Sequence, residues 1–284
     1  MKKIWLLIKT TNNGWNRNYA QSMGAALAFY TLFSIAPLLL IVLSITGYVF
    51  GLEAARGEVA GQLNSLMGEQ GAMAVQALLE NVSQPKDGAM ATIIGVVLLL
   101  VGATSVFAEL QNSLDRIWRA PERVRVNGWF ALLHERLLSF GMILGVGFIL
   151  MVSLVFSAAI AAISQWWSPQ FEEWIMLVNM LNILFSFMMT TAMFALIYKF
   201  MPSVKIRWDE VWIGAVITAI LFTVGKHLIG LYIGKSAIAS GFGIAGSLIA
   251  LLIWVYYSAQ IFLLGAEFTW AYSSIYGSRK LIKT

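Results

Sequence analysis

Uncharged apolar runs longer than about 18 residues, the length that marks a membrane-spanning helix, restrict this chain to a membrane fold. Only 12% of its 284 residues are charged and 59% are hydrophobic, whereas a soluble domain carries about 25% charged residues. A bilayer requires helices or closed barrels, and the run "ATIIGVVLLLVGA" (91–103) lacks the alternation of polar and apolar residues found in barrel strands. The sequence therefore predicts an all-α polytopic membrane protein.

Six apolar runs predict six transmembrane helices within a single membrane domain that covers residues 1–284. Their approximate ranges are 22–50, 88–108, 138–163, 174–200, 209–232 and 242–272. Some exceed the roughly 20 residues that a bilayer requires, so we expect tilted helices or protruding ends. The start, "MKKIWLLIKT", is continuously apolar only at residues 4–8, whereas a signal-peptide core needs roughly 7 to 15 residues. The first span is therefore expected to serve as an uncleaved anchor.

Basic residues gather in alternate connections between the spans. The first connection has two basic residues against five acidic ones, and the third has acidic residues alone. The N-terminal segment carries Lys2, Lys3, Lys9 and Arg17, and the second connection carries Arg116, Arg119, Arg123, Arg125 and Arg136. The fourth connection carries Lys199, Lys205 and Arg207, and the tail carries Arg279, Lys280 and Lys283. Because basic connections stay on the cytoplasmic side, this pattern predicts that both termini are cytoplasmic.

The first outer connection, residues 51–87, is long enough to hold structure of its own. Two runs of apolar residues at helical spacing, separated by Gly68 and Gly71, predict two short amphipathic helices on the outer face. These residues are Val59, Leu63, Leu66 and Met67, then Val75, Leu78, Leu79 and Val82. The two helices can lie on the membrane or cap the helix bundle; we favour the cap.

Several stretches together resemble one protein family in their order and spacing. They are "ALAFYTLFSIAPLLLIVLSI" (26–45), "ELQNSLDRIWR" (109–119), "YKFMPSVKIRW" (198–208), "VGKHLIGLYIG" (224–234) and "LIWVYYSAQIFLLGAEFTW" (252–270). From about residue 15 to residue 272 the chain resembles the YihY/virulence factor BrkB family. The resemblance implies a six-helix protein of the bacterial inner membrane, linked to serum resistance and to transport of lipids or envelope components. The family also carries an older label, ribonuclease BN.

Lys226 interrupts the apolar fifth span. If that span enters near residue 210, Lys226 lies about 24 Å further along it, in the outer half of the bilayer. Either its amine reaches the outer headgroups, or it faces a cavity and offers a cation to an anionic ligand. Lys235, expected just beyond the helix end, is a second candidate for this site. His227 points about 100° away from Lys226 and is interpreted as a packed residue rather than a ligand.

Four charged residues fall near the cytoplasmic ends of their spans. They are Glu109, Arg116, Lys199 and Glu267. A network among them would act as a latch that holds the helix ends together, or as an inner gate, since a buried ion pair that loses one partner is costly. We favour the latch.

Polar residues within the fourth span share one helix face, because they are spaced three or four apart. They are Asn179, Asn182, Ser186 and Thr190. Hydrogen bonds between helices explain them more simply than a hydrophilic path does. Pro37, in the middle of the first span, removes one backbone donor and predicts a kink there.

Several chemistries find no support in the sequence. The chain has no cysteine, which excludes thiolate ligands and thiol nucleophiles, and its two histidines are expected on opposite sides of the membrane. "GFGIAG" (241–246) matches a dinucleotide-binding pattern but precedes a membrane helix and follows no strand. No phosphate-binding loop of the G-x-x-x-x-G-K-[ST] type occurs. We therefore expect neither an enzyme nor a bound cofactor.

The sequence favours a transporter or a protein that handles lipids or envelope components. Membrane lipids, anionic ones included, are its expected partners. The basic second connection is explained by the charge rule for cytoplasmic loops, so specific nucleic-acid binding is not expected. A non-transporting scaffold that binds a partner is the alternative, and a ribonuclease is disfavoured because no cluster of carboxylates or histidines is evident.

Overall fold

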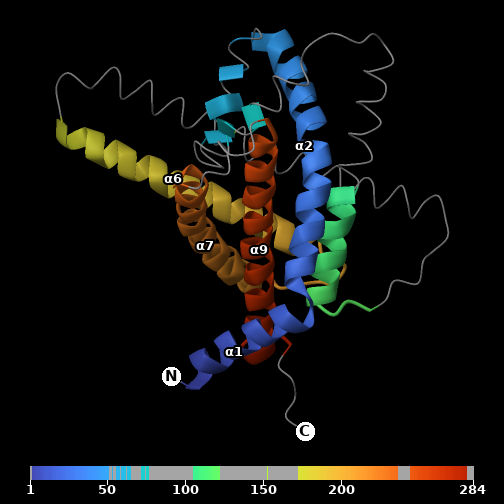
Figure 1. Cartoon of the computed structure of the whole chain (residues 1–284). Coiled ribbons are helices and arrows are strands. Elements are labelled where there is room, and N and C mark those ends of the chain that lie inside the picture. Colours follow the sequence, from blue (N-terminus) through green and yellow to red (C-terminus); the bar gives the residue numbers. More distant parts are fainter. Residues whose placement is uncertain are drawn as a thin grey trace. The chain divides into compact units, whose positions relative to one another are not determined.

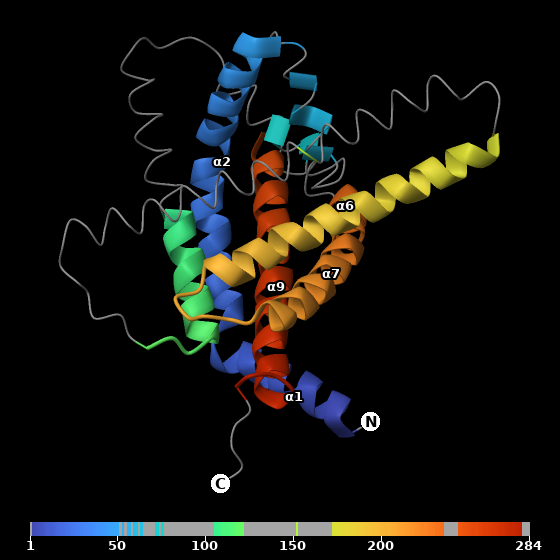
Figure 2. The same cartoon turned by 180° about the vertical axis from the view of Figure 1, so that it is seen from behind.

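The computed structural model describes residues 2–50, 105–121, 172–235 and 244–279, with scattered helical positions between 53 and 76 and at 152. These parts contain helices and no strand, which confirms the predicted all-α class. The helices with defined bounds are α1 (Lys2–Arg17), α2 (Ala20–Phe50), α6 (Glu172–Phe200), α7 (Trp208–Lys235) and α9 (Ile244–Ile275). A further helix covers residues 105–117 (Figures 1 and 2).

Three helical segments are long and apolar enough to cross a membrane: Met180–Phe200, Trp208–Ile233 and Leu248–Ile275. They coincide with the spans expected at 174–200, 209–232 and 242–272. α2 has 31 residues and no charge and coincides with the expected first span, although only Ala20–Ile35 contributes to its described apolar segment. Apart from helical residues 105–108 and 152, the spans expected at 88–108 and 138–163 lie outside the described residues.

Helix α1 was not expected from the sequence. It occupies the first 16 described residues, and its end is marked by Tyr19, whose φ of 55° is left-handed. The amide of Asn18 bonds the carbonyl of Gly14 at 2.9 Å, and the amide of Tyr19 bonds that of Asn16 at 3.2 Å. A left-handed residue of this kind commonly ends a helix. α2 begins directly after it.

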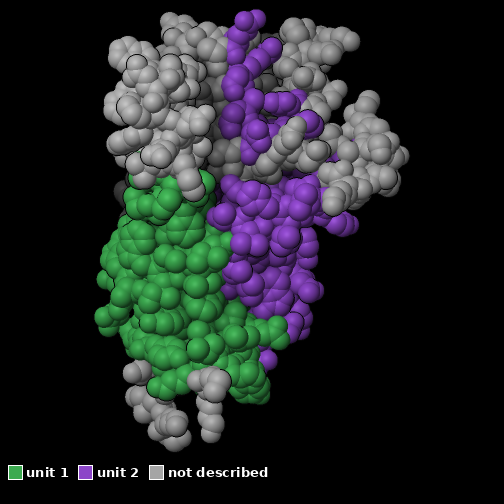
Figure 3. Space-filling view, turned by 90° about the vertical axis from the view of Figure 1, so that its left-hand side faces the viewer, with its two compact units in different colours: residues 1–12, 114–220, 265–284 green, residues 13–113, 221–264 purple. Residues whose placement is uncertain are grey.

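The chain divides into two compact units, coloured separately in Figure 3. Unit 1 comprises residues 1–12, 114–220 and 265–284, and unit 2 comprises residues 13–113 and 221–264. α7 and α9 each contribute one part to each unit, so the packing of each unit is described by itself.

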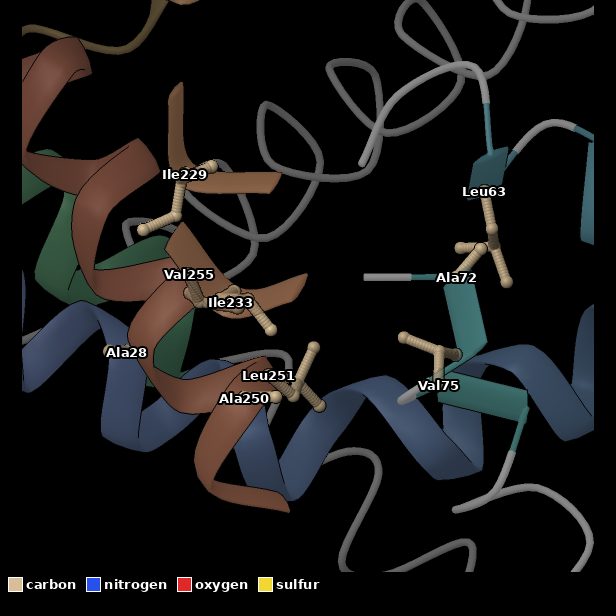
Figure 4. Packing of buried hydrophobic residues seen from close by; sticks show 9 residues of the cluster. All are labelled: Ala28, Leu63, Ala72, Val75, Ile229, Ile233, Ala250, Leu251 and Val255. Atoms are coloured by element: carbon tan, nitrogen blue, oxygen red, sulfur yellow. The ribbon is translucent and has the colours of Figure 1, made fainter. Parts of the chain in front are cut away.

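In unit 2, part of the first connection packs against α7 and α9. Leu63 and Val75 are buried in one hydrophobic cluster with Ile229 of α7 and Leu251 and Val255 of α9. Figure 4 shows the side chains from the connection and those from the two long helices within this cluster. The described positions of the connection thus pack with residues of α7 and α9 within unit 2, and the cap stays a prediction.

In unit 1, α7 and α9 approach closely through two reciprocal pairs of glycine and threonine. A Cβ atom on Gly214 of α7 would overlap the side chain of Thr269 on α9, and one on Gly265 of α9 would overlap Thr218 on α7. Each threonine hydroxyl donates to the carbonyl four residues earlier, Thr218 to Gly214 and Thr269 to Gly265, both at 2.7 Å. Small residues allow such close packing between membrane helices.

Candidate functional site

The carboxylate of Glu210 accepts the hydrogen bonds that hold one end of unit 1 together. Glu210 lies in the first turn of α7 and is 2% exposed. It accepts a hydrogen bond from the Ser273 hydroxyl at 2.8 Å and one from the Ser278 amide at 2.6 Å. A Cβ atom on Gly277 would overlap the same carboxylate. The turn that follows α9 is therefore folded onto the start of α7, with a buried acid as its acceptor.

A second carboxylate, that of Asp115, binds the loop between α6 and α7. The amide of Ser203 donates to Asp115 Oδ1 at 2.6 Å, and the Ser203 hydroxyl donates to Asp115 Oδ2. Asp115 lies near the end of helix 105–117, within the stretch "ELQNSLDRIWR", and Ser203 lies within "YKFMPSVKIRW". Two stretches that carry the family resemblance thus meet in unit 1.

Helix 105–117 ends in a left-handed cap built on an arginine. Arg119 has a φ of 50°, its amide bonds the carbonyl of Arg116, and the Ala120 amide bonds that of Asp115 at 2.8 Å. This is the Schellman pattern, in which glycine is the usual left-handed residue. The guanidinium of Arg119 lies 4.1 Å from the ring centroid of Trp270 on α9. A stack of this kind offsets the backbone cost of an arginine at this position.

Arg279, after the end of α9, contacts Trp118, the residue that follows helix 105–117. Its Nη1 donates to the carbonyl of Trp118 at 3.2 Å, and its guanidinium lies 5.2 Å from the Trp118 ring centroid. Trp118 is 1% exposed. Together with Asp115, Ser203, Arg119 and Glu210, these contacts form a polar cluster at the helix ends of unit 1, which we call the helix-end cluster.

Tyr198 of α6 lies further inside unit 1, at the close crossing of α7 and α9. Its hydroxyl and that of Thr218 are 3.0 Å apart, and both residues are fully buried. A Cβ atom on Gly265 would lie 2.6 Å from the Tyr198 hydroxyl, so the tyrosine occupies the space that the glycine leaves.

The residues predicted to form a latch or gate lie in different surroundings. Glu267 is fully buried on α9, and Arg116 is exposed at the end of helix 105–117. Lys199 donates to the carbonyl of Ile206, and its Nζ lies 5.2 Å from the ring centroid of Trp208. Glu109 belongs to unit 2, whereas the other three belong to unit 1. The latch and the gate both stay predictions.

Lys226 lies half-buried on the part of α7 that belongs to unit 2. The neighbouring Gly225 is buried, and a Cβ atom on it would overlap Ile261 of α9 and lie 3.1 Å from Tyr257. Lys226 therefore borders the seam between α7 and α9. His227 is exposed, as a residue turned about 100° away from Lys226 can be.

Lys235 is not beyond the helix, because α7 continues to it. The side chain of Lys235 lies outside the described residues. Its place beside Lys226 at one site therefore stays a prediction.

The polar stripe on α6 is only partly described. Asn182, Ser186 and Thr190 are half-buried, and the Thr190 hydroxyl donates to the Ser186 carbonyl at 2.9 Å, within its own helix. The side chain of Asn179 lies outside the described residues. The same holds for Pro37, through which α2 continues as helix.

Comparison with known proteins decides the family. A sequence profile described as "Virulence factor BrkB" matches residues 12–283, nearly the whole chain. The chain belongs to this family.

Relatives of this BrkB-family chain are named as membrane proteins. A "UPF0761 membrane protein" of Tolumonas auensis is 27% identical over 245 residues, which are 86% of this chain and 77% of the relative. One of Azotobacter vinelandii is 27% identical over 86% of this chain and 57% of its own length. One from a Psychrobacter species is 26% identical over 88% of this chain and 45% of its own length. The chain thus spans about half the length of some relatives. No solved structure matches it.

The helix-end cluster was missed by sequence reasoning. In the sequence, Glu210 and its neighbour Asp209 resemble ordinary acidic residues at a helix start. In the structure only Asp209 of the two is exposed, in an ion pair with Arg207 at 2.9 Å. Asp115 lies in a stretch shared with the BrkB family, which was the one signal available. No group of three or more histidine, cysteine or acidic side chains that could hold a metal occurs within the described ranges.

Proposed function

We propose that this BrkB-family chain is a non-enzymatic protein of the bacterial inner membrane that binds an anionic lipid or envelope component and moves it across the bilayer. The observation that carries the proposal is Lys226, a half-buried lysine within the apolar span Trp208–Ile233. Ionisable residues within membrane helices are costly and usually face the bundle interior or a water-filled path.

The surroundings of Lys226 in unit 2 support a ligand site at the seam of α7 and α9. Phe222, one turn before Lys226, lies on the same side of α7 and packs edge-on against Trp254 of α9, with ring centroids 6.4 Å apart. The lysine therefore has an aromatic neighbour on the side that faces α9. An ammonium beside aromatic rings suits an amphiphile with an anionic head and an apolar body.

The charge pattern supports the orientation that the proposal needs. The basic residues in alternate connections favour cytoplasmic termini, and with that orientation Lys226 lies in the outer half of the bilayer. A cation at this depth would attract an anionic headgroup that leaves the outer leaflet or arrives there.

Native mass spectrometry on the purified protein tests the proposed ligand. We expect a specific anionic lipid to remain on the wild type and to be lost from a folded Lys226→Met variant. Lys205→Met is the control, because it removes an equal charge from an exposed side chain in the loop before α7, and it should retain the lipid. Equal lipid retention by all three proteins would refute the site.

Transbilayer movement is tested separately in proteoliposomes. Fluorescently labelled phosphatidylglycerol, quenched from outside by dithionite, should change leaflet faster in the presence of the wild type than in that of Lys226→Met. Binding without such movement would favour the alternative, a scaffold that retains lipid, over a transporter.

The ribonuclease function is not proposed. Nuclease chemistry needs carboxylates or histidines that are available to a metal or to the substrate. Asp115 and Glu210, the acidic residues of the helix-end cluster, each accept hydrogen bonds from neighbouring serines, so their oxygens serve the packing of the chain.

A further inference from the structure

Helix α1 presents an apolar strip that no role described so far uses. Ile4, Trp5 and Ile8 are 62%, 62% and 61% exposed, although each has a large hydrophobic side chain. At about 100° per residue they lie within one sector of the helix. Leu7 and Thr11, on an adjoining sector, are buried. α1 therefore has one side against the protein and a second apolar side directed outwards.

The charge of this end of the chain is entirely positive. The first acidic residue is Glu53, and Lys2, Lys3, Lys9 and Arg17 all precede it. Lys3, Lys9 and Arg17 are exposed, and Lys9 Nζ lies 4.8 Å from the ring centroid of Trp5. At about 100° per residue, Lys9 borders the apolar strip, whereas Lys3 and Arg17 lie on roughly the opposite side of the helix. An exposed apolar face combined with a basic face is typical of helices that lie in a membrane surface.

Contacts within unit 1 place α1 at the end of a membrane span. Lys3 Nζ lies 5.8 Å from the ring centroid of Tyr276, the residue that follows the end of α9 and of the span Leu248–Ile275. Figures 1 and 2 show α1 crossing the foot of α9 rather than continuing along it. In a bilayer, the end of a membrane span meets the headgroups.

Exposed tryptophans mark the same boundary on α7. Trp208 and Trp212, in the first turns of α7, are 44% and 45% exposed. Tryptophan is enriched where membrane helices enter the interface, because its ring is amphipathic. Trp5 of α1 is exposed in the same way, so all three of these tryptophans of unit 1 have the exposure expected of interfacial residues.

We infer that α1 is an in-plane membrane anchor. Its strip of Ile4, Trp5 and Ile8 enters the boundary between headgroups and acyl chains, while Lys3, Lys9 and Arg17 contact the phosphates of anionic lipids. The absence of acidic residues before Glu53 and the position beside the end of α9 favour a lipid surface over a protein as the occupant. The inference is independent of the role of Lys226.

Site-directed spin labelling of the full-length protein tests the depth of the strip, because the chain contains no native cysteine. Labels at Ile4→Cys and Ile8→Cys are compared with one at Asn13→Cys, which is exposed and nine residues from Ile4, about 180° around the helix. The variants are reconstituted in phosphatidylcholine vesicles that contain phosphatidylglycerol. The labels at positions 4 and 8 should collide more with oxygen than with a nickel chelate, at a depth of roughly 5–10 Å, and the label at 13 should show the reverse.

Two results would overturn the inference. If all three labels favour the nickel chelate, the strip faces water. If the labels at 4 and 8 are protected from both reagents, a protein surface, such as a second copy of the chain, covers the strip instead of lipid.

The role of the basic residues is tested by lipid composition. Removing phosphatidylglycerol from the vesicles should reduce the difference in depth between positions 8 and 13. In the triple variant Lys3→Gln, Lys9→Gln, Arg17→Gln this difference should no longer respond to phosphatidylglycerol. The same response with and without the three charges would refute the contact with anionic headgroups.

Discussion

Ser203 donates two hydrogen bonds, from its amide and from its hydroxyl, to the two carboxylate oxygens of Asp115, 88 positions earlier in the sequence. The loop between α6 and α7 is thereby held at the end of helix 105–117 within unit 1. Because the amide donor of Ser203 belongs to the backbone, the contact depends on the acid more than on the serine.

Substitution of Asp115 should therefore destabilise the protein more than substitution of Ser203. Asp115→Ala removes both acceptors and should lower the free energy of unfolding by about 1–2 kcal/mol. Ser203→Ala keeps the bond from the amide and should cost about 1 kcal/mol or less. Thermal unfolding in detergent measures both, and a larger loss for Ser203→Ala would contradict the arrangement.

Gly214 and Gly265 should not tolerate alanine. A Cβ atom at either position overlaps a threonine of the facing helix, and overpacking of this kind costs about 1–3 kcal/mol. Gly230 of α7 is the matched control, since a Cβ atom there meets nothing within 4 Å. Gly230→Ala should be neutral or slightly stabilising, because alanine favours the helix more than glycine does. Similar melting temperatures for all three variants would contradict the close crossing.

Substitutions of Arg119 should rank in stability by how well each new residue adopts the left-handed backbone. Arg119→Ala keeps the left-handed backbone and loses the stack on Trp270, so its melting temperature should fall. Arg119→Gly loses the same stack but recovers about 1 kcal/mol of backbone energy, since glycine adopts φ values near 50° without steric cost. Glycine should thus be the more stable variant, although alanine is favoured over glycine in the interior of a helix. The opposite order would show that the cap is not left-handed in the membrane.

Glu210 should control the segment that follows α9. Glu210→Ala leaves the Ser273 hydroxyl and the Ser278 amide without their acceptor, at a cost of about 1–3 kcal/mol, and limited proteolysis should cut the tail faster. Asp209→Ala is the control, because its ion pair with Arg207 joins exposed side chains, with exposures of 59% and 66%, and such pairs contribute little. Equal proteolysis of both variants would argue against a tail held by Glu210.

The long apolar helices were predictable because one property, hydropathy over about 20 residues, determines them. α6, α7 and α9 follow the expected ranges for this reason. α1 was missed because the apolar run at residues 4–8 was compared only with the length of a signal-peptide core or of a membrane span. The helical spacing of Ile4, Leu7 and Ile8 was nevertheless present in the sequence.

The polar contacts were less predictable because they join distant segments. No local pattern connects Asp115 with Ser203, and a buried Glu210 looks like its exposed neighbour Asp209 in the sequence. The reciprocal spacing of Gly214 with Thr218 and of Gly265 with Thr269 could have been noticed, since small residues four apart indicate close helix packing. Lys226 was selected because it is charged within an apolar run, and its role stays a prediction that the experiments above test.

Only Asn18 and Tyr19 separate α1 from α2, and both sides of this corner are hydrogen-bonded. The Asn18 amide bonds Gly14 at 2.9 Å, and the Ser22 amide bonds Tyr19 at 2.9 Å. Backbone hydrogen bonds therefore hold the chain on both sides of the corner. A thinner bilayer increases the tilt of a long membrane helix, and the hydrogen-bonded corner would transmit a tilt of α2 to residues 14–17 of α1, which belong to the same unit. The thickness of the membrane would then become a mechanical signal at the end of α2.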